Sequence, residues 1–259
     1  MGDQALATPT NRSVIRTFAI LNAFRQLGGQ GTAREVARCS GMDQATAHRF
    51  IATLEQVGAV TRDRGGRFSL GMTLAELGLV VPAHRIILDA CEDALGPVAP
   101  RLGETLHVGV LEGDMVTYLY KAASPRPSGE RTRAGAQLEA YGTALGKVLL
   151  AHLPATALSA YLYDGNFVRL TETTIADPEA LRSELMNVQV QAYALDFGET
   201  YRGVHCVAVP VRSATGKVIA ALSCTGAAER LDADRMRAIV PELSAAADAI
   251  RARLYSAAQ

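Results

Sequence analysis

The sequence lacks the features that mark membrane, secreted and disulfide-bonded proteins. It has no apolar run that approaches the ~20 residues needed to cross a bilayer. Its first ten residues contain no basic segment followed by an apolar stretch, so we expect no secretory signal. The four cysteines are scattered, without the close pairing of a disulfide framework. Together these absences predict a cytoplasmic protein with reduced thiols and no membrane partner.

Proline is absent from a long part of the chain. None occurs between Thr10 and Val81, whereas nine occur from Pro82 onward. A segment without proline can form helices without interruption. We therefore expect a helix-rich first module, followed by a second module that is built differently.

A net charge of zero conceals a difference between these two parts. Residues 11–70 hold nine Arg, no Lys and four acidic residues, a balance of +5, and residues 71–259 hold seventeen basic and twenty-one acidic residues, a balance of −4. At 259 residues, with 49% apolar and 20% charged residues, the chain has the composition of a globular protein of one or two domains. A small basic module joined to a larger acidic one indicates nucleic-acid binding beside a second task. Chance clustering of surface charge is the plain alternative.

The first module has the signals of three helices. Apolar residues at helical spacing predict a helix with one buried face from Asn11 to Leu27. The positions that define this face are Val14, Ile15, Phe18, Leu21 and Phe24. Thr32 and Glu35 fit a capping box at the start of a second helix, and Gly41 fits its end. Asp43 is a suitable N-cap for a third helix.

The third helix carries the most informative pattern. Its apolar stripe consists of Ala47, Phe50, Ile51, Leu54 and Val57. Its polar side consists of Gln44, Thr46, His48, Arg49 and Thr53. Two helices joined by a short glycine-containing turn are typical of a helix-turn-helix, whose second helix enters the major groove. We expect Arg49 to contact guanine or phosphate, Gln44 to contact adenine, and Thr46 and His48 to contact phosphates or base edges.

A basic hairpin is predicted after the third helix. Two short strand-like runs flank the turn Asp63-Arg64-Gly65-Gly66, a spacing typical of a β-hairpin. Arg62, Arg64 and Arg67 place three cations on this hairpin. A hairpin after a helix-turn-helix makes a winged helix, with the cations of the wing along the phosphates. The alternative is a winged helix used for protein contacts.

A forty-residue stretch of this module resembles a known family. Residues 32–71, TAREVARCSGMDQATAHRFIATLEQVGAVTRDRGGRFSLG, are similar to the DNA-binding domain of the isocitrate lyase regulator (IclR) family. The distinctive parts are ATAHR followed by LE and Gly, and the wing RD…GRF-x-LG. The resemblance implies a winged helix-turn-helix that binds double-stranded operator DNA.

The second module combines strand and helix signals. A helix predicted over about 71–90 links it to the first module, and Pro82 is expected to bend or break that helix. The predicted strands cover Thr105–Leu111, Met115–Ala122, Tyr193–Asp196, Val204–Val211 and Lys217–Thr225. The predicted helices cover Thr143–His152, a segment that begins at Asp177, and Asp232–Tyr255. Helices that flank an antiparallel sheet define an α+β domain. We therefore expect domains at 11–72 and 73–256.

The order of these elements resembles the effector-binding domain of the same family, which has a GAF-like fold. The segments that carry the resemblance are GETLHVGVLEGDMVTYLYKAASP, YGTALGKVLLAHLP, LTETTIADPEAL and GVHCVAVPVRSATGKVIAALSCTG. With the first module, the resemblance covers about residues 11–255. It implies a ligand-responsive transcriptional regulator that forms a homodimer or homotetramer and binds a small-molecule effector.

The phase of the strands predicts a small polar cavity. Ser223 and Thr225 are two residues apart and project from one face, Cys206 projects from the neighbouring strand, and Asp196 lies just before a loop. The resemblance implies that the effector is held at Ala144, Leu145, Asp196, Cys206, Ser223 and Thr225. The first two open a helix whose free N–H groups favour a carboxylate, so the expected ligand is a small organic acid. The plain alternative is a structural core that tolerates hydroxyls.

Three positions depart from the pattern of the family. Tyr141 stands where many relatives have His, Leu145 stands where they have Ala or Gly, and Thr225 adds a methyl group relative to Ser. Because Leu145 is bulkier, we expect it to narrow the cavity or redirect it.

No motif in the sequence supports enzyme chemistry. The chain has no G-x-S-x-G, phosphate-binding loop or H-E-x-x-H pattern, and no short Cys/His spacing for zinc. His205 and Cys206 invite a nucleophile interpretation, but adjacent strand residues face opposite sides and cannot pair directly. We expect no catalysis, cofactor or metal. Two alternatives stay open: a metabolic enzyme with an appended regulatory winged helix, and a DNA-binding protein with a purely structural second domain.

Overall fold

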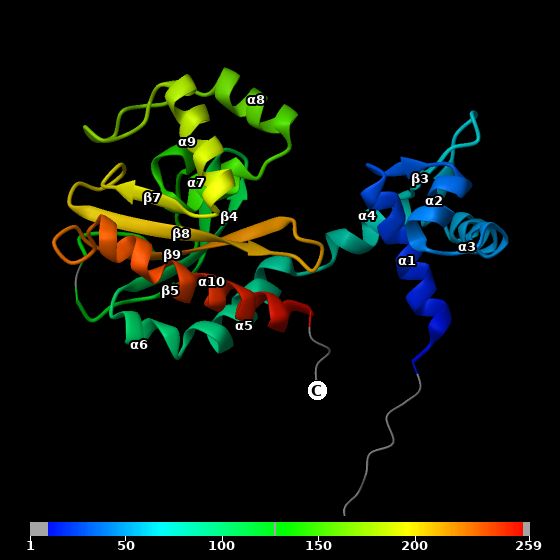
Figure 1. Cartoon of the computed structure of the whole chain (residues 1–259), viewed down its shortest axis with the longest axis horizontal. Helices are drawn as coiled ribbons and strands as arrows, with labels where there is room; N and C mark the ends of the chain where they lie inside the picture. The colour runs from blue at the N-terminus through cyan, green and yellow to red at the C-terminus, as the bar shows by residue number, and fades with distance from the viewer. Residues whose placement is uncertain (1–9, 127, 256–259) are drawn as a thin grey trace, which may run out of the picture. The chain divides into compact units, whose positions relative to one another are not determined.

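The chain divides between Pro82 and Ala83 into two compact units (Figure 1). The computed structural model describes residues 10–126 and 128–255. Residues 1–9, which carry the expectation about a secretory signal, lie outside the described residues. Residue 256, the predicted end of the second domain, also lies outside them.

The first three helices of the first unit begin and end where the local sequence places them. They are α1 (Arg12–Gln26), α2 (Ala33–Ser40) and α3 (Gln44–Gln56). Asn11 caps α1, Thr32 and Glu35 form the predicted capping box on α2, and Asp43 caps α3. Gly41 ends α2 in the left-handed region, with φ at 68°. The side-chain caps satisfy backbone N–H groups that the helix ends leave free.

A three-stranded sheet completes the winged helix. Its strands are β1 (Gln30–Gly31), β2 (Val60–Arg62) and β3 (Phe68–Leu70), in the order β1-β3-β2. β2 and β3 form the predicted hairpin, with Arg62 opposite Phe68. β1 is not predicted by the sequence, because its two residues carry no alternation. The largest side chains of the core are Ile20, Phe24, Val36, Ile51, Leu54 and Phe68.

The buried face of α1 is shorter than its apolar stripe. The C-terminal half of α1 packs on the core that it shares with α2 and α3. In the N-terminal half, Val14, Ile15 and Phe18 are 51%, 57% and 61% exposed. The prediction of one buried face along the whole helix is therefore wrong for this half, because the core of this unit does not reach so far. Val57, at the end of the α3 stripe, is exposed for the same reason.

The helix predicted over 71–90 is in fact two helices. α4 (Met72–Leu79) and α5 (Ala83–Leu95) are separated by residues 80–82, which confirms the interruption at Pro82. Proline has no N–H for the helical ladder and its ring clashes with the preceding turn. None of the eight residues of α4 is buried, whereas α5 packs its apolar side into the second unit.

A six-stranded antiparallel sheet forms the centre of the second unit. Its strands are β4 (Thr105–Glu112), β5 (Met115–Ala122), β6 (Gln137–Glu139), β7 (Ala194–Phe197), β8 (Val204–Arg212) and β9 (Val218–Ala227). Their order is β6-β5-β4-β9-β8-β7. All five predicted strands form, and the short β6 is additional. Because β4 pairs with β9, segments far apart in the sequence meet in the middle of the sheet.

Helices cover both faces of this sheet, as Figure 1 shows. The helices α5, α6 (Val98–Leu102) and α10 (Ala233–Tyr255) pack on one face. On the other face lie α7 (Ala144–Ala151), α9 (Pro178–Gln191) and the short helical turn η1 (Ala140–Gly142), with α8 (Ala155–Asp164) against α9. The unit is therefore the predicted α+β domain, with a separate apolar core on each face.

The described helices do not meet the requirements of a membrane span. Within residues 10–126 and 128–255, none combines the length and the apolar character that crossing a bilayer requires.

Candidate functional site

The first candidate surface is the polar side of α3. Gln44, His48 and Arg49 are exposed and Thr46 is half-buried. The backbone N–H of Thr46 donates to the cap Asp43 at 2.8 Å. The Arg49 guanidinium lies 3.5 Å from the hydroxyl of Thr46. The structure therefore places all four predicted side chains on the first two turns of one helix, with hydrogen-bond donors that face water.

The wing presents its three arginines differently. Arg62 lies over the ring of Phe68, 5.2 Å from the centroid, and this contact holds its guanidinium on the hairpin. Arg67 lies 4.0 Å from the carboxylate of Glu35, which offsets part of its charge. Arg64, at the turn, is exposed and makes no hydrogen bond or ion pair within the described residues. Arg64 is thus the wing cation most open to a phosphate.

The second candidate site is a cavity between the sheet and the start of α7. It is a narrow cavity, with a free volume of about 20 Å³. All six residues predicted for the effector line it, namely Ala144, Leu145, Asp196, Cys206, Ser223 and Thr225. The strand register explains the convergence, because Asp196 pairs with Cys206 and Cys206 pairs with Thr225. Four strand residues therefore face the helix N-terminus from one side of the sheet.

The sequence does not predict several other side chains of the cavity. The polar ones are His107, Tyr118, Glu130, Thr132, Thr143, Thr200 and Tyr201. His107 is placed there because β4 pairs with β9, which sets His107 opposite Ser223. The local sequence does not predict the pairing of β4 with β9, because the two strands are far apart in the chain. The loop that follows β5 adds Glu130 and Thr132.

The start of α7 supplies donors to the cavity. The Thr143 hydroxyl accepts the N–H of Gly146 at 3.0 Å, and its carbonyl accepts the N–H of Lys147 at 2.9 Å. The N–H groups of Ala144 and Leu145 have no partner within the described residues. Free N–H groups at a helix N-terminus favour an anion.

A glycine lets the chain before α7 approach the helix closely. A Cβ at Gly146 would lie 2.0 Å from the carbonyl oxygen of Ala140, so no larger residue fits there without a shift of the backbone. This close approach packs η1 onto α7, whose first residues, Ala144 and Leu145, line the cavity.

Asp196 is the acidic group at the edge of the sheet. Its side chain is buried, and Oδ1 accepts the backbone N–H of Glu199 at 2.7 Å. Burial, together with the nearby charge of Glu199, raises the pKa of Asp196 to about 7. Near neutral pH this carboxyl group therefore exists in both protonation states.

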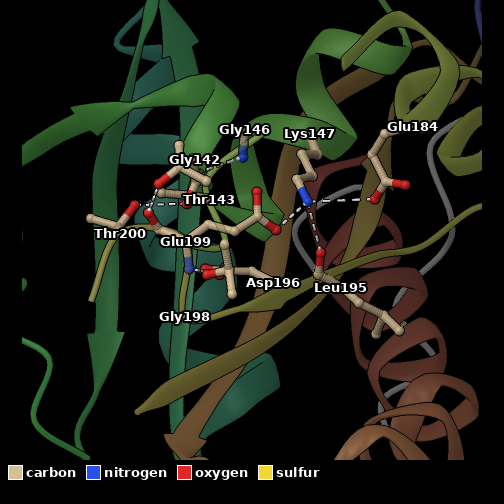
Figure 2. A network of polar contacts seen from close by, with 12 residues as sticks. Gly142, Thr143, Gly146, Lys147, Glu184, Leu195, Asp196, Gly198, Glu199 and Thr200 are labelled. Carbon is tan, nitrogen blue, oxygen red and sulfur yellow. Dashed lines mark hydrogen bonds and ion pairs between the residues drawn. The ribbon is translucent and has the colours of Figure 1, made fainter. Parts of the chain in front are cut away.

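A buried ion pair fixes the loop that follows Asp196 (Figure 2). Lys147 Nζ lies 2.5 Å from Glu199 Oε1, 3.4 Å from Glu184 Oε1 and 3.0 Å from the carbonyl oxygen of Leu195. Burial raises the pKa of Glu199, although Lys147 opposes this, and Glu199 Oε2 has no hydrogen-bond partner within the described residues. The network ties the β7–β8 loop to α7.

A second contact holds the same loop at its other side. The Thr200 hydroxyl donates to the carbonyl oxygen of Gly142 at 2.6 Å (Figure 2). Thr171 and Thr174 donate to the carbonyl oxygens of Gly198 and Glu199. The loop therefore holds Asp196 and Thr200 at the cavity through contacts with three separate segments.

The thiol at the cavity is not poised for nucleophilic attack. Burial, and the charge of Asp196, raise the pKa of Cys206 well above its usual value, so the thiol stays protonated. Its sulfur contacts Thr225, whereas His205 Nδ1 contacts the carbonyl oxygen of Leu231 at 2.9 Å. His205 and Cys206 thus have different partners on opposite faces of β8, as the strand phase predicts.

Two of the residues that depart from the family pattern, Leu145 and Tyr141, lie at different places relative to the cavity. Leu145 lines the cavity and is almost fully buried, so its bulk does occupy the site. Tyr141 does not line the cavity, because its hydroxyl donates to the carbonyl oxygen of Val168 at 2.9 Å and its ring packs on Phe167. Of these two residues, only Leu145 therefore contributes to the wall of the cavity.

Within residues 10–126 and 128–255, no group of three or more His, Cys, Asp or Glu side chains is placed to hold a metal ion.

Two family models match this chain, one for each unit. The IclR helix-turn-helix domain matches residues 13–64, and the bacterial transcriptional regulator IclR C-terminal domain matches residues 81–252. The second match alone covers more than half of the chain.

Individual proteins match over most of their length. The HTH-type transcriptional regulator XynR of Escherichia coli (strain K12) is 34% identical over 225 residues, which are 86% of this chain and 89% of XynR. The crystal structure of IclR from Thermotoga maritima is 28% identical, covers 94% of this chain and 99% of its own, and gives a TM-score of 0.64. An IclR homologue from Microbacterium hydrocarbonoxydans, crystallised with 4-hydroxybenzoate, is 28% identical with the same coverage and a TM-score of 0.63.

Proposed function

The chain belongs to the IclR family of bacterial transcriptional regulators, and we propose that a small organic acid, bound in the cavity of the second unit, controls how the first unit binds operator DNA. Membership makes the protein a DNA-binding regulator with an effector-binding C-terminal domain. It also excludes the alternative of a metabolic enzyme with an appended winged helix.

The proposed DNA contacts come from α3 and the wing. The helix enters the major groove, where Gln44 and Arg49 contact base edges and Thr46 and His48 contact phosphates or bases. Arg62, Arg64 and Arg67 lie along the DNA backbone, with the largest phosphate contribution from Arg64, because Glu35 lies beside Arg67 and the ring of Phe68 holds Arg62. The exposed donors of α3 support this assignment.

One observation carries the choice of ligand. The partner-free N–H groups of Ala144 and Leu145 open into a cavity that also holds the hydroxyl of Ser223, which is 2% exposed and makes no hydrogen bond within the described residues. Buried donors without partners favour a ligand that supplies acceptors. A carboxylate supplies several acceptor sites in a small volume, and Asp196 accommodates it when protonated.

Self-association is part of the proposal. The first unit exposes large apolar side chains on α1 and α4, and the most exposed are Val14, Ile15, Phe18, Met72, Leu77 and Leu79. A monomer would leave this surface in water, whereas a second copy would cover it. A homodimer then places two α3 helices on half-sites about one helical turn apart, and a homotetramer adds further half-sites.

Effector binding controls operator binding through thermodynamic linkage between the two events. An effector changes operator affinity only if it binds one arrangement of the protein more tightly than another. The β7–β8 loop, which borders the cavity and is tied to α7 through Lys147, is the element we expect to respond.

The test is fluorescence anisotropy with tiled DNA from around the coding gene, in a series of salt concentrations. Tight binding to one tile with a steep salt slope supports the operator function. The same complex is then titrated with small carboxylates, each of which is also tested for a thermal shift of the free protein. Uniformly weak binding to tiles from the whole genome would contradict the DNA function. Absence of any shift or release by carboxylates would favour a structural second domain.

A further inference from the structure

A groove separate from the effector cavity lies along β7 and α9. It is open to solvent and has a free volume of about 630 Å³. Asp196 lines the cavity, whereas its neighbours on the strand, Leu195 and Phe197, line the groove, since side chains alternate along a strand. Among the described residues, the groove and the cavity share no lining residue. The groove is therefore a second candidate site in the same unit.

The groove has a buried, charged floor and an exposed, apolar rim. We define the floor as Lys147, Glu199 and Glu184, whose side chains are 1%, 5% and 26% exposed. We define the rim as Val190 and Phe197, which are 88% and 39% exposed. Two large apolar side chains in water beside a charged floor match a ligand that has one polar and one apolar end.

The cation of the floor has no proton left for a ligand. An ammonium group has three N–H donors, and Lys147 Nζ contacts three acceptors, which are Glu199 Oε1, Glu184 Oε1 and the carbonyl oxygen of Leu195. Figure 2 shows this ammonium between the two carboxylates. An anion in the groove would therefore find the cation engaged and would face two carboxylates. The groove does not suit a carboxylate or a phosphate.

The floor lacks donors and positive charge. Glu199 Oε2 is buried without a hydrogen-bond partner, and Glu184 Oε2 makes no hydrogen bond either, within the described residues. Because two carboxylates share one ammonium, one negative charge is unmatched when both are ionised. Burial raises the pKa of Glu199 despite Lys147, and a second cation beside it would favour the ionised form. A buried acceptor without a partner is costly, and a ligand with a charged N–H donor would satisfy it.

An organic cation fits this floor better than a metal ion does. The ammonium of Lys147 already lies between the two carboxylates, where a metal ion would need to be. A metal ion also needs several ligands around it, and the part of the chain that the structure describes places no group of three suitable side chains together. An organic ammonium needs acceptors on one side only, and its carbon chain can pack on Val190 and Phe197 at the rim.

We propose that the groove is a second ligand site, which binds a small organic amine with its ammonium at Glu184 and Glu199 and its apolar part on Val190 and Phe197. The site does not depend on which ligand the effector cavity binds. Glu199 nevertheless belongs to both regions, because its backbone N–H donates to Asp196 Oδ1 at 2.7 Å. An amine in the groove would contact the residue that positions Asp196 at the cavity.

The test uses two probe series on the full-length protein at neutral pH, measured by isothermal titration calorimetry. One series is pentylamine, pentanol and trimethylpentylammonium. The other is phenylethylamine, phenylethanol and trimethyl-phenylethylammonium. The alcohol removes the charge of the amine, and the trimethyl compound keeps the charge but removes the N–H donors. In the series that fits the groove, we expect the amine to bind about tenfold or more tightly than both counterparts.

Matched variants locate the amine in the groove. Glu184→Gln removes a charge from the floor and should weaken amine binding about tenfold, whereas Glu179→Gln, at a 79% exposed position of the same helix, should not. Val190→Lys adds a cation to the rim and should also weaken binding, whereas Gln189→Lys adds it to α9 outside the groove and should not. Ser223→Ala alters only the effector cavity and should leave amine binding unchanged. Circular dichroism checks that each variant folds.

Several results would overturn the amine site. One is an alcohol or a trimethyl compound that binds as tightly as its amine. Another is amine binding that survives Glu184→Gln and Val190→Lys in folded proteins, or that Ser223→Ala abolishes, because either places the amine outside the groove. A third is the absence of binding by both amines up to about 10 mM, which corresponds to a very weak interaction. None of these results bears on the organic acid of the cavity, which the carboxylate titrations test separately.

Discussion

The two units hold their polar groups in opposite ways. In the first, Gln44, Arg49 and Arg64 stand in water on a helix and a hairpin whose shapes depend on local capping contacts. In the second, Lys147 and Asp196 are buried, and their partners come from other segments of the fold. A surface that contacts a charged polymer needs exposed cations, whereas a cavity that selects a small molecule needs a few fixed polar groups in a dry surrounding.

The largest test of this contrast removes the buried cation. Lys147→Met leaves Glu199 buried without its partner and should lower the free energy of unfolding by about 3–5 kcal/mol, measured by urea denaturation with circular dichroism. The matched control is Lys217→Met, because Lys217 is exposed and has no ion pair within the described residues, and it should change stability by less than about 0.5 kcal/mol. Combining Lys147→Met with Glu199→Gln should restore part of the loss. Equal effects of the two single substitutions would contradict the burial argument.

The next test removes an exposed cation. Arg49→Ala should weaken operator binding by about 1–3 kcal/mol with little change in stability, measured by anisotropy and thermal unfolding. Arg251→Ala, which removes an exposed arginine of α10, serves as the control and should leave operator affinity unchanged. An operator affinity unaffected by Arg49→Ala would remove this residue from the reading surface.

A third test separates the tasks of the two units. Ser223→Ala and Asp196→Ala should leave operator binding intact. Each should weaken the binding free energy of an organic acid by about 1–3 kcal/mol, because each deletes a buried polar partner of the ligand. Ser159→Ala, at an exposed position of α8, is the control. Loss of operator binding in a folded Asp196→Ala protein would argue against this division.

The smallest effect is a dependence on pH. The pKa of Asp196 is raised from 3.8 to about 7, so folding favours the protonated carboxyl group. The resulting contribution to the free energy of unfolding is complete below about pH 4 and is lost as the pH rises to about 7. Above that pH an ionised Asp196 repels a carboxylate ligand, so affinity should fall by up to about 1.4 kcal/mol for each pH unit. Calorimetry between pH 6 and 8 measures this trend, which Asp196→Asn should flatten. A rise in affinity with pH would contradict the assignment.

The helix caps and the strand phase are predictable from the sequence. Thr32 and Glu35 meet as a capping box because residues three apart face each other at a helix start. Ser223 and Thr225 share a face because side chains alternate along a strand. The six positions that the sequence and the family resemblance predicted for the effector all line one cavity.

Burial is where predictions from the sequence fail. Val14, Ile15 and Phe18 have the spacing of a buried face, but the core of the first unit ends before them. The same limit applies to Lys147, because nothing in the local sequence shows that its ammonium lies among Glu199, Glu184 and a carbonyl oxygen. Whether a side chain is covered depends on neighbours supplied by other segments.

By itself, the sequence determined the caps of α2 and α3, the polar side of α3, and the side of the sheet that carries Ser223 and Thr225. These features depend on spacing along the chain, which hydrogen-bond geometry converts directly into structure. Only the tertiary structure placed His107 beside Thr225 and Thr132, and gave Asp196 its raised pKa. Those properties arise from strand pairing and burial between distant segments, and local spacing carries no information about either.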